Sequence, residues 1–72
     1  MTTEHDHLAV AIRHIVSGEA RVRQQRELVD RLAQHGHDTV LAQTVLDTMQ
    51  TSLQQMQEHR QMIERAIAGG RK

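Results

Sequence analysis

Histidine is the residue best suited to chemistry in this sequence, which holds six histidines and no cysteine. Because no thiolate is available, imidazole and carboxylate groups are the metal ligands that remain, and imidazole suits zinc or nickel. His35, His37 and Asp38 bring ligands of both kinds together near the middle of the chain. Their spacing matches no defined metal motif. A metal- or ligand-binding sensor at these residues is therefore a hypothesis that needs the turns of two chains to meet.

A di-iron site is a second kind of histidine chemistry to consider. Glu4 and His7 form one Glu-x-x-His pair, the spacing with which di-iron bundles place two ligands on one helical face. Those bundles use two such pairs and two further carboxylates. The second half of the chain offers only Glu58 followed directly by His59, and adjacent side chains on a helix diverge. We therefore expect solvated end residues here, and no cofactor.

Phosphotransfer is the third kind. A dimeric helical hairpin with an exposed histidine on its first helix resembles the plan of histidine phosphotransfer domains. His14 and His59 would lie at one level on facing helices, but His14 is followed by Ile15 where such domains usually carry an acidic residue. A histidine phosphorelay module is an alternative hypothesis, and a packed or water-bonded histidine pair is the simpler one.

Charge and aromatic content argue against nucleic acid and membrane partners. Nine basic residues balance nine acidic ones and aromatic content is 0%, so neither a steering field nor a stacking platform can form. Arg21 and Arg23 would point about 160° apart on a helix, so with Arg26 they form no basic stripe. No apolar run approaches the ~20 residues of a membrane span. We expect a cytoplasmic protein that binds neither partner.

The length of 72 residues allows one small domain with a marginal core. Such a chain has no room for a pocket that excludes water, and it lacks both a thiol and a nucleophile beside a base. We therefore expect no enzymatic activity.

Two long helices and one turn must position all these residues, and the chain contains no proline to interrupt them. Thr3, with Asp6 three residues later, predicts a weak capping box for a first helix over residues 4–34. Gly36 should cap its end, since glycine adopts the left-handed conformation without a Cβ penalty. After a turn at residues 35–38, which Asp38 closes, a second helix should cover residues 39–68 and end in a basic tail, residues 71–72. The expected fold is an all-α antiparallel two-helix hairpin, one domain over residues 1–72.

An apolar seam at heptad spacing runs along each predicted helix. Its positions lie alternately three and four residues apart, which keeps them on one helical face. They are Leu8, Ala11, Ile15, Gly18, Val22, Gln25, Val29 and Leu32 in the first helix, and Ala42, Leu46, Met49, Leu53, Met56, Arg60, Ile63 and Ile67 in the second. Folding the chain at Gly36 sets Gly18 beside Met56, whose flexible thioether can fill the gap that a glycine leaves.

The apolar stripe is wider than one partner helix can cover, because Ile12, Val16 and Leu28 flank the seam. A second copy is the simplest cover, and two hairpins related by a twofold axis form a four-helix bundle. We expect a homodimer that acts as a non-enzymatic protein–protein interaction or oligomerisation module, with another protein as the alternative partner. The predicted interface comprises Leu8, Ile12, Ile15, Gly18, Val22, Gln25, Val29, Leu32, Leu46, Met49, Leu53, Met56, Ile63 and Ile67.

Three polar residues, Gln25, Glu19 and Arg60, lie at or beside this seam. One polar group at a seam position can fix register and oligomer state at some cost in stability. We expect these residues to play that part, with Glu19 about one turn from Arg60.

Three short motifs carry a resemblance to a family. They are the His-Ile-x-x-Gly-Glu pattern of residues 14–19, the glutamine-rich run of residues 23–26, and the Gly-His-Asp-Thr turn of residues 36–39. In these the chain resembles short hairpin proteins that recur in alphaproteobacterial genomes, over roughly residues 7–67. The resemblance implies a helical hairpin in a bacterial cytoplasm, and it carries over no catalytic residue.

Overall fold

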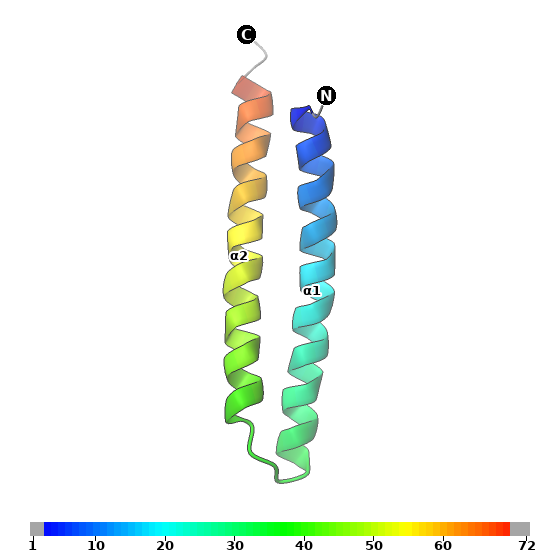
Figure 1. Cartoon of the computed structure of the whole chain (residues 1–72), viewed down its shortest axis with the longest axis vertical. Coiled ribbons are helices and arrows are strands. Elements are labelled where there is room, and N and C mark those ends of the chain that lie inside the picture. The colour runs from blue at the N-terminus through cyan, green and yellow to red at the C-terminus, as the bar shows by residue number, and fades with distance from the viewer. Residues whose placement is uncertain (1–2, 70–72) are drawn as a thin grey trace.

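The computed structural model describes residues 3–69, which form two helices and no strand. Helix α1 spans Glu4–Gln34 and helix α2 spans Val40–Gly69. They run antiparallel and side by side, joined by one turn (Figure 1). The bounds of α1 are those expected from the sequence, and α2 begins and ends one residue later than expected. The basic tail of residues 71–72 lies outside the described residues.

Helix α1 begins with a complete capping box. The backbone N–H of Asp6 donates to Thr3 Oγ1 at 3.1 Å, and the backbone N–H of Thr3 donates to the Asp6 carboxylate at 3.0 Å. Both N–H groups lack a partner inside the helix, so the two side chains satisfy them reciprocally. The predicted box is confirmed, with aspartate in the place that glutamate usually takes.

Gly36 ends α1 as predicted. Its φ of 72° is left-handed, and no other described residue has a positive φ. The N–H of His37 donates to the Leu32 carbonyl at 2.9 Å, and the N–H of Gly36 donates to the Ala33 carbonyl at 3.1 Å. These two bonds make a Schellman cap, which satisfies carbonyls that the end of the helix leaves free.

Asp38 starts the return helix. Its Oδ1 accepts a hydrogen bond from the Val40 N–H at 2.9 Å. The Thr39 carbonyl accepts the N–H of Gln43 at 2.8 Å, which forms the first turn of α2. Asp38 therefore supplies an acceptor for an N–H that has no helical partner, and its charge lies at the positive end of the helix dipole.

The two helices pack along the predicted seam. Ala11, Ile15, Val22 and Leu46 are its buried members, with exposed fractions of 4–8%. The other seam residues are half-buried. Gly18 lies at the predicted level, since a Cβ placed on it would come 3.5 Å from Met56 Sδ. The heptad spacing therefore predicted correctly which face of each helix meets the other.

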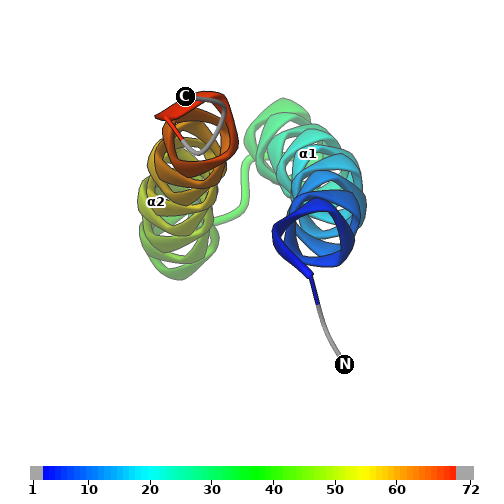
Figure 2. The same cartoon turned by 90° about the horizontal axis from the view of Figure 1, so that it is seen from above.

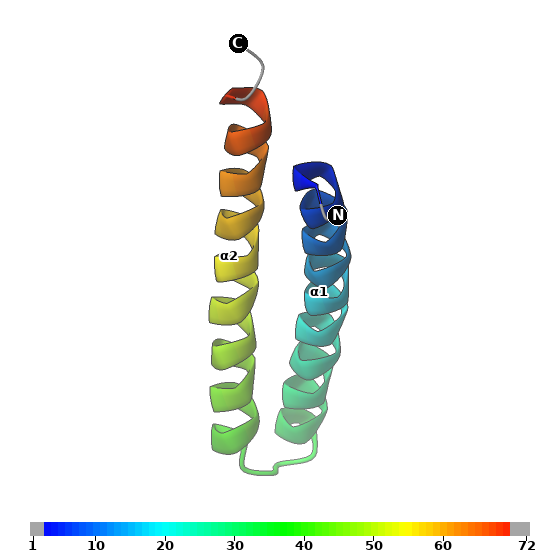
Figure 3. The same ribbon diagram turned by 45° about the horizontal axis from the view of Figure 1, so that its top comes forward.

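The hairpin is long and thin. Its Cα atoms extend over 58 × 15 × 15 Å. Seen from above, each helix has only the other as a neighbour, and the rest of its circumference faces outward (Figures 2 and 3). The radius of gyration is 16.6 Å, whereas a compact domain of this length has about 11 Å. Most side chains of the described chain therefore lie at the surface.

Candidate functional site

The turn holds the three residues predicted to bind metal. His35 Nδ1–H donates to the Arg31 carbonyl at 2.7 Å, and the Asp38 carboxylate caps α2. The ring centroids of His35 and His37 are 6.5 Å apart. Over residues 3–69 no three histidine or carboxylate side chains gather closely enough to hold one metal ion. A metal at the turn remains a prediction that a second chain would have to complete.

The polar residues of the seam have different partners. Gln25 is half-buried, and its Nε2 donates to the Ala42 carbonyl of α2 at 2.9 Å, so it links the two helices. Arg60 does not, since its Nε forms an ion pair with Glu64 on its own helix at 2.6 Å. Glu19 instead lies beside Arg23 and Arg26. Of the three predicted register-setting residues, Gln25 is the one that bonds across the hairpin.

The predicted interface residues are largely used by the hairpin itself. All of them except Ile12 are buried or half-buried against the other helix. Ile12 is 37% exposed. The seam therefore offers a second copy only the outer edges of its side chains, and any further contact surface must lie on the flanks.

One flank of the hairpin carries three shallow hollows in a row, and we call it the apolar flank. Its α1 residues recur at spacings of three, four or seven, as do its α2 residues, so each set forms one strip of its helix. The strips are His7, Val10, His14, Arg21 and Leu28 on α1, and Leu41, Val45, Thr48, Ser52 and His59 on α2. Arg21 is the one formally charged residue of these strips.

The opposite flank, which we call the charged flank, is mixed, since Ile12 and Val16, 37% and 60% exposed, lie on the same strip of α1 as its charged residues. One of its hollows is lined by Glu19, Arg23 and Arg26 with two seam residues. The other is lined by Gln57, Arg60, Gln61 and Glu64. The three neighbouring arginines are thus divided, with Arg21 on the apolar flank and the other two on the charged flank beside an acidic residue. This division leaves no single-sign stripe of the kind that follows a nucleic acid backbone. Neither α1 nor α2, over the described residues, is long and apolar enough to cross a bilayer.

The end of the apolar flank next to the turn carries the most exposed large apolar side chain of the described chain. Leu41 is 78% exposed, and Val45 beside it is 38% exposed. They line one hollow with Leu28 and Leu32 from α1. Large apolar groups that gather at one place on a surface mark a contact site more often than single exposed ones do.

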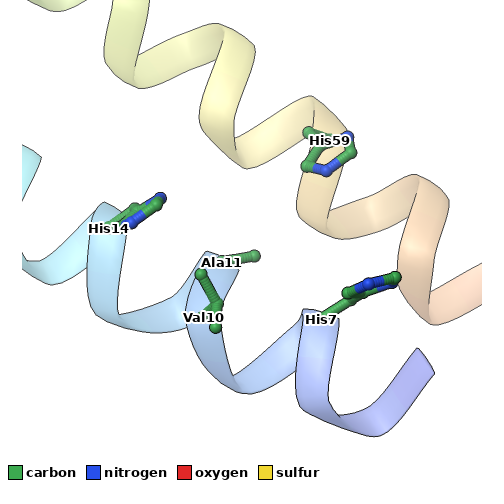
Figure 4. A pocket seen from close by; sticks show the side chains of 5 residues that line it. All are labelled: His7, Val10, Ala11, His14 and His59. Atoms are coloured by element: carbon green, nitrogen blue, oxygen red, sulfur yellow. The ribbon is translucent and has the colours of Figure 1, made fainter. Parts of the chain in front are cut away.

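The far end of the same flank carries histidines. His7, Val10, Ala11 and His14 from α1 line a hollow whose other side is formed by His59 from α2. All three imidazoles border this hollow, with Ala11 between the two helices (Figure 4). His14 and His59, the phosphorelay candidates, thus lie together at the surface.

The apolar flank is a surface that was not predicted from the sequence. His7 was expected to be a solvated end residue, yet His7 and His14 are seven residues apart and share a helical face. Leu41, Val45, Thr48 and Ser52 have the same four-and-three spacing as the seam. This second strip beside the seam is the sequence pattern that could have predicted the apolar flank. Comparison with protein-family models, with curated proteins and with solved structures finds no match for the chain.

Proposed function

We propose that the protein is a non-enzymatic interaction module whose working form is a homodimer, two hairpins packed by their apolar flanks into a four-helix bundle. The observation that carries the proposal is the excess surface of the single hairpin. Its accessible surface is 5733 Å². A compact monomer of 8.2 kDa exposes about 4,500 Å². The hairpin thus exposes about 1,200 Å² more than its mass requires.

That excess has the size of a stable interface. Obligate homodimers bury ~2,000 Å² or more in total, which is about 1,000 Å² for each partner. The core of the single hairpin is correspondingly thin. Four apolar side chains of the described residues are buried, and none is less than 2% exposed. A second copy would complete a core that two helices cannot close.

The two flanks differ in their suitability as a contact. A second copy on the apolar flank covers Leu41, Val45 and Val10, and it desolvates the formal charges of Arg21 and Asp38 in each copy. On the charged flank it would cover Ile12 and Val16, but it would desolvate five charged side chains, Glu19, Arg23, Arg26, Arg60 and Glu64. Burying charged groups costs more than burying apolar ones yields unless each is paired. The apolar flank is therefore the contact surface of the proposal.

The remaining parts of the proposal concern the setting. The dimer acts by holding two copies together or by presenting its outer surface to another protein, in the bacterial cytoplasm that the resemblance to alphaproteobacterial hairpin proteins implies. The small formal charge of the apolar flank and the balanced charge of the chain support a protein partner over a nucleic acid.

A matched pair of variants at the start of α2 tests the proposed surface. Leu41 lines the hollow at the turn end, whereas its neighbour Val40, which is 69% exposed, lines none of the hollows of the apolar flank. Leu41→Glu should raise the dissociation constant of the dimer at least about tenfold, because it buries a charge in the contact. Val40→Glu should leave that constant nearly unchanged. Sedimentation equilibrium measures both.

The pair contains its own control for folding. Glutamate suits the first turn of a helix, so neither variant should lose helix content by circular dichroism. Equal weakening of the dimer by both variants, or by neither, would show that the apolar flank is not the contact surface.

A further inference from the structure

We propose that the homodimer holds one zinc ion between two histidine pairs, His14 and His59 from each copy, at the end of the bundle away from the turns. This inference rests on the proposed dimer, because one hairpin supplies too few ligands. The positions of His14 and His59 on the apolar flank support it.

His14 and His59 come from different helices and line the same hollow on the apolar flank (Figure 4). The contact of Gly18 with Met56 fixes the register, and counting four residues from Gly18 to His14 and three from Met56 to His59 reaches nearly the same level. His7 lies two turns further along α1, about 10 Å from the level of His14.

Over residues 3–69 no three ligating side chains come together, so His14 and His59 of one hairpin cannot complete a metal site by themselves. Zinc in proteins takes four ligands in tetrahedral geometry. A twofold partner on the apolar flank supplies the missing two, since every residue of an isologous contact appears twice.

The two ends of the apolar flank differ in chemistry, and this difference favours one direction of the partner. The turn end of the flank is apolar, with Leu28, Leu41 and Val45, and the other end carries the histidines. A twofold axis parallel to the bundle places the turn end of one copy beside the turn end of the other, and the histidines of one copy beside those of the other. An axis across the bundle would place imidazoles against the leucines, where their ring nitrogens would lose hydrogen bonds to water without gaining others. The matched arrangement puts both turns at one end.

In that arrangement α1 of each copy faces α2 of the other, so His14 of one copy lies across from His59 of the second. Four imidazoles then surround one level of the bundle. Neutral imidazole is a common ligand of zinc, and no cysteine is present to compete for the metal. The ion would link the two copies and make the stability of the dimer depend on zinc.

Isothermal titration of the full chain with zinc chloride, followed by sedimentation equilibrium, tests the site. The expected result is one zinc per two chains, with tighter dimerisation when zinc is present. His14→Gln and His59→Gln should each lower zinc affinity at least about 100-fold, because each removes two of the four ligands. Both side chains are exposed, so these changes should leave the fold intact.

Two control variants sharpen the result. His7→Gln, in the same hollow but two turns away, should keep zinc binding, and so should the double change His35→Gln, His37→Gln at the turn. A zinc stoichiometry of one per chain, or loss of zinc binding in either control, would contradict a site formed by His14 and His59 of both copies. A dimer that binds no zinc would overturn the site and leave the proposed function standing. A monomer both with and without zinc would overturn both.

Discussion

Gly18 sets the distance between the helices at the middle of the hairpin. A Cβ on this residue would lie 3.2 Å from Leu53 Cδ1 and 3.5 Å from Met56 Sδ. The first distance is short for a carbon–carbon contact, since such atoms are at their optimum at about 3.5–4.0 Å. Leu53 is half-exposed and Cδ1 is the end of its side chain, so a small shift can relieve the contact.

Two substitutions at Gly18 should therefore act in opposite directions. Gly18→Ala should raise the free energy of unfolding by up to about 1 kcal/mol, because alanine is the better helix former and Leu53 can give way. Gly18→Leu should lower it by about 1–3 kcal/mol, because a large side chain must push Met56 aside. Urea unfolding followed by circular dichroism measures both. Equal losses of unfolding free energy in the two variants would mean that the side chains packed against Gly18 cannot move aside.

Asp6 makes the start of α1 sensitive to acid. The Thr3 backbone N–H, then the Thr3 side chain, hold the pKa of the Asp6 carboxyl below its usual range, and the nearby His7 and His5 act in the same direction. A carboxyl whose pKa is lower in the folded state stabilises that state above the unfolded pKa of about 3.9, and the contribution is lost as pH falls through the lower, folded value. Asp6→Asn should remove this part of the acid dependence. The test compares melting temperatures of the two proteins between neutral pH and about pH 3.

At the level of whole elements, the heptad spacing predicted the facing sides of both helices, and the capping residues Thr3, Gly36 and Asp38 predicted their ends and the turn between them. The partners of long polar side chains could not be predicted in the same way. Arg60 pairs with Glu64 on its own helix and not with the predicted Glu19, because side chains four residues apart on a helix are direct neighbours. Gln25 bonds to a backbone carbonyl, and every residue has one, so no sequence pattern marks it. The apolar flank could not be predicted in this way either, because matching its α1 strip to its α2 strip requires the register of the two helices to within one residue.

The turn depends on a single left-handed residue. Gly36 has φ 72°, where an L side chain clashes with its own backbone. Gly36→Ala should therefore lower the free energy of unfolding by about 1–2 kcal/mol, while Gly36→Asn should cost less because asparagine tolerates this conformation. Thermal melts of the three proteins at one fixed concentration give the comparison. An alanine variant as stable as the parent would show that the Schellman cap contributes little.

The hairpin is more extended than a compact globular domain of the same length. Its largest dimension is 58 Å, and its radius of gyration exceeds that of a compact chain of the same length by about half. The charged flank carries more charged groups that water solvates well, whereas the apolar flank has the strongly exposed Leu41 at its end. The proposed second copy would cover that flank and give each helix two antiparallel neighbours, as in four-helix bundles.

The molar mass in solution tests this most directly. Sedimentation equilibrium of the purified full chain at several concentrations should give about 16 kDa, twice the 8.2 kDa of one chain, with dissociation only on dilution. A mass of 8.2 kDa at the highest concentration, with helix content intact, would contradict the homodimer and with it the function proposed for the apolar flank.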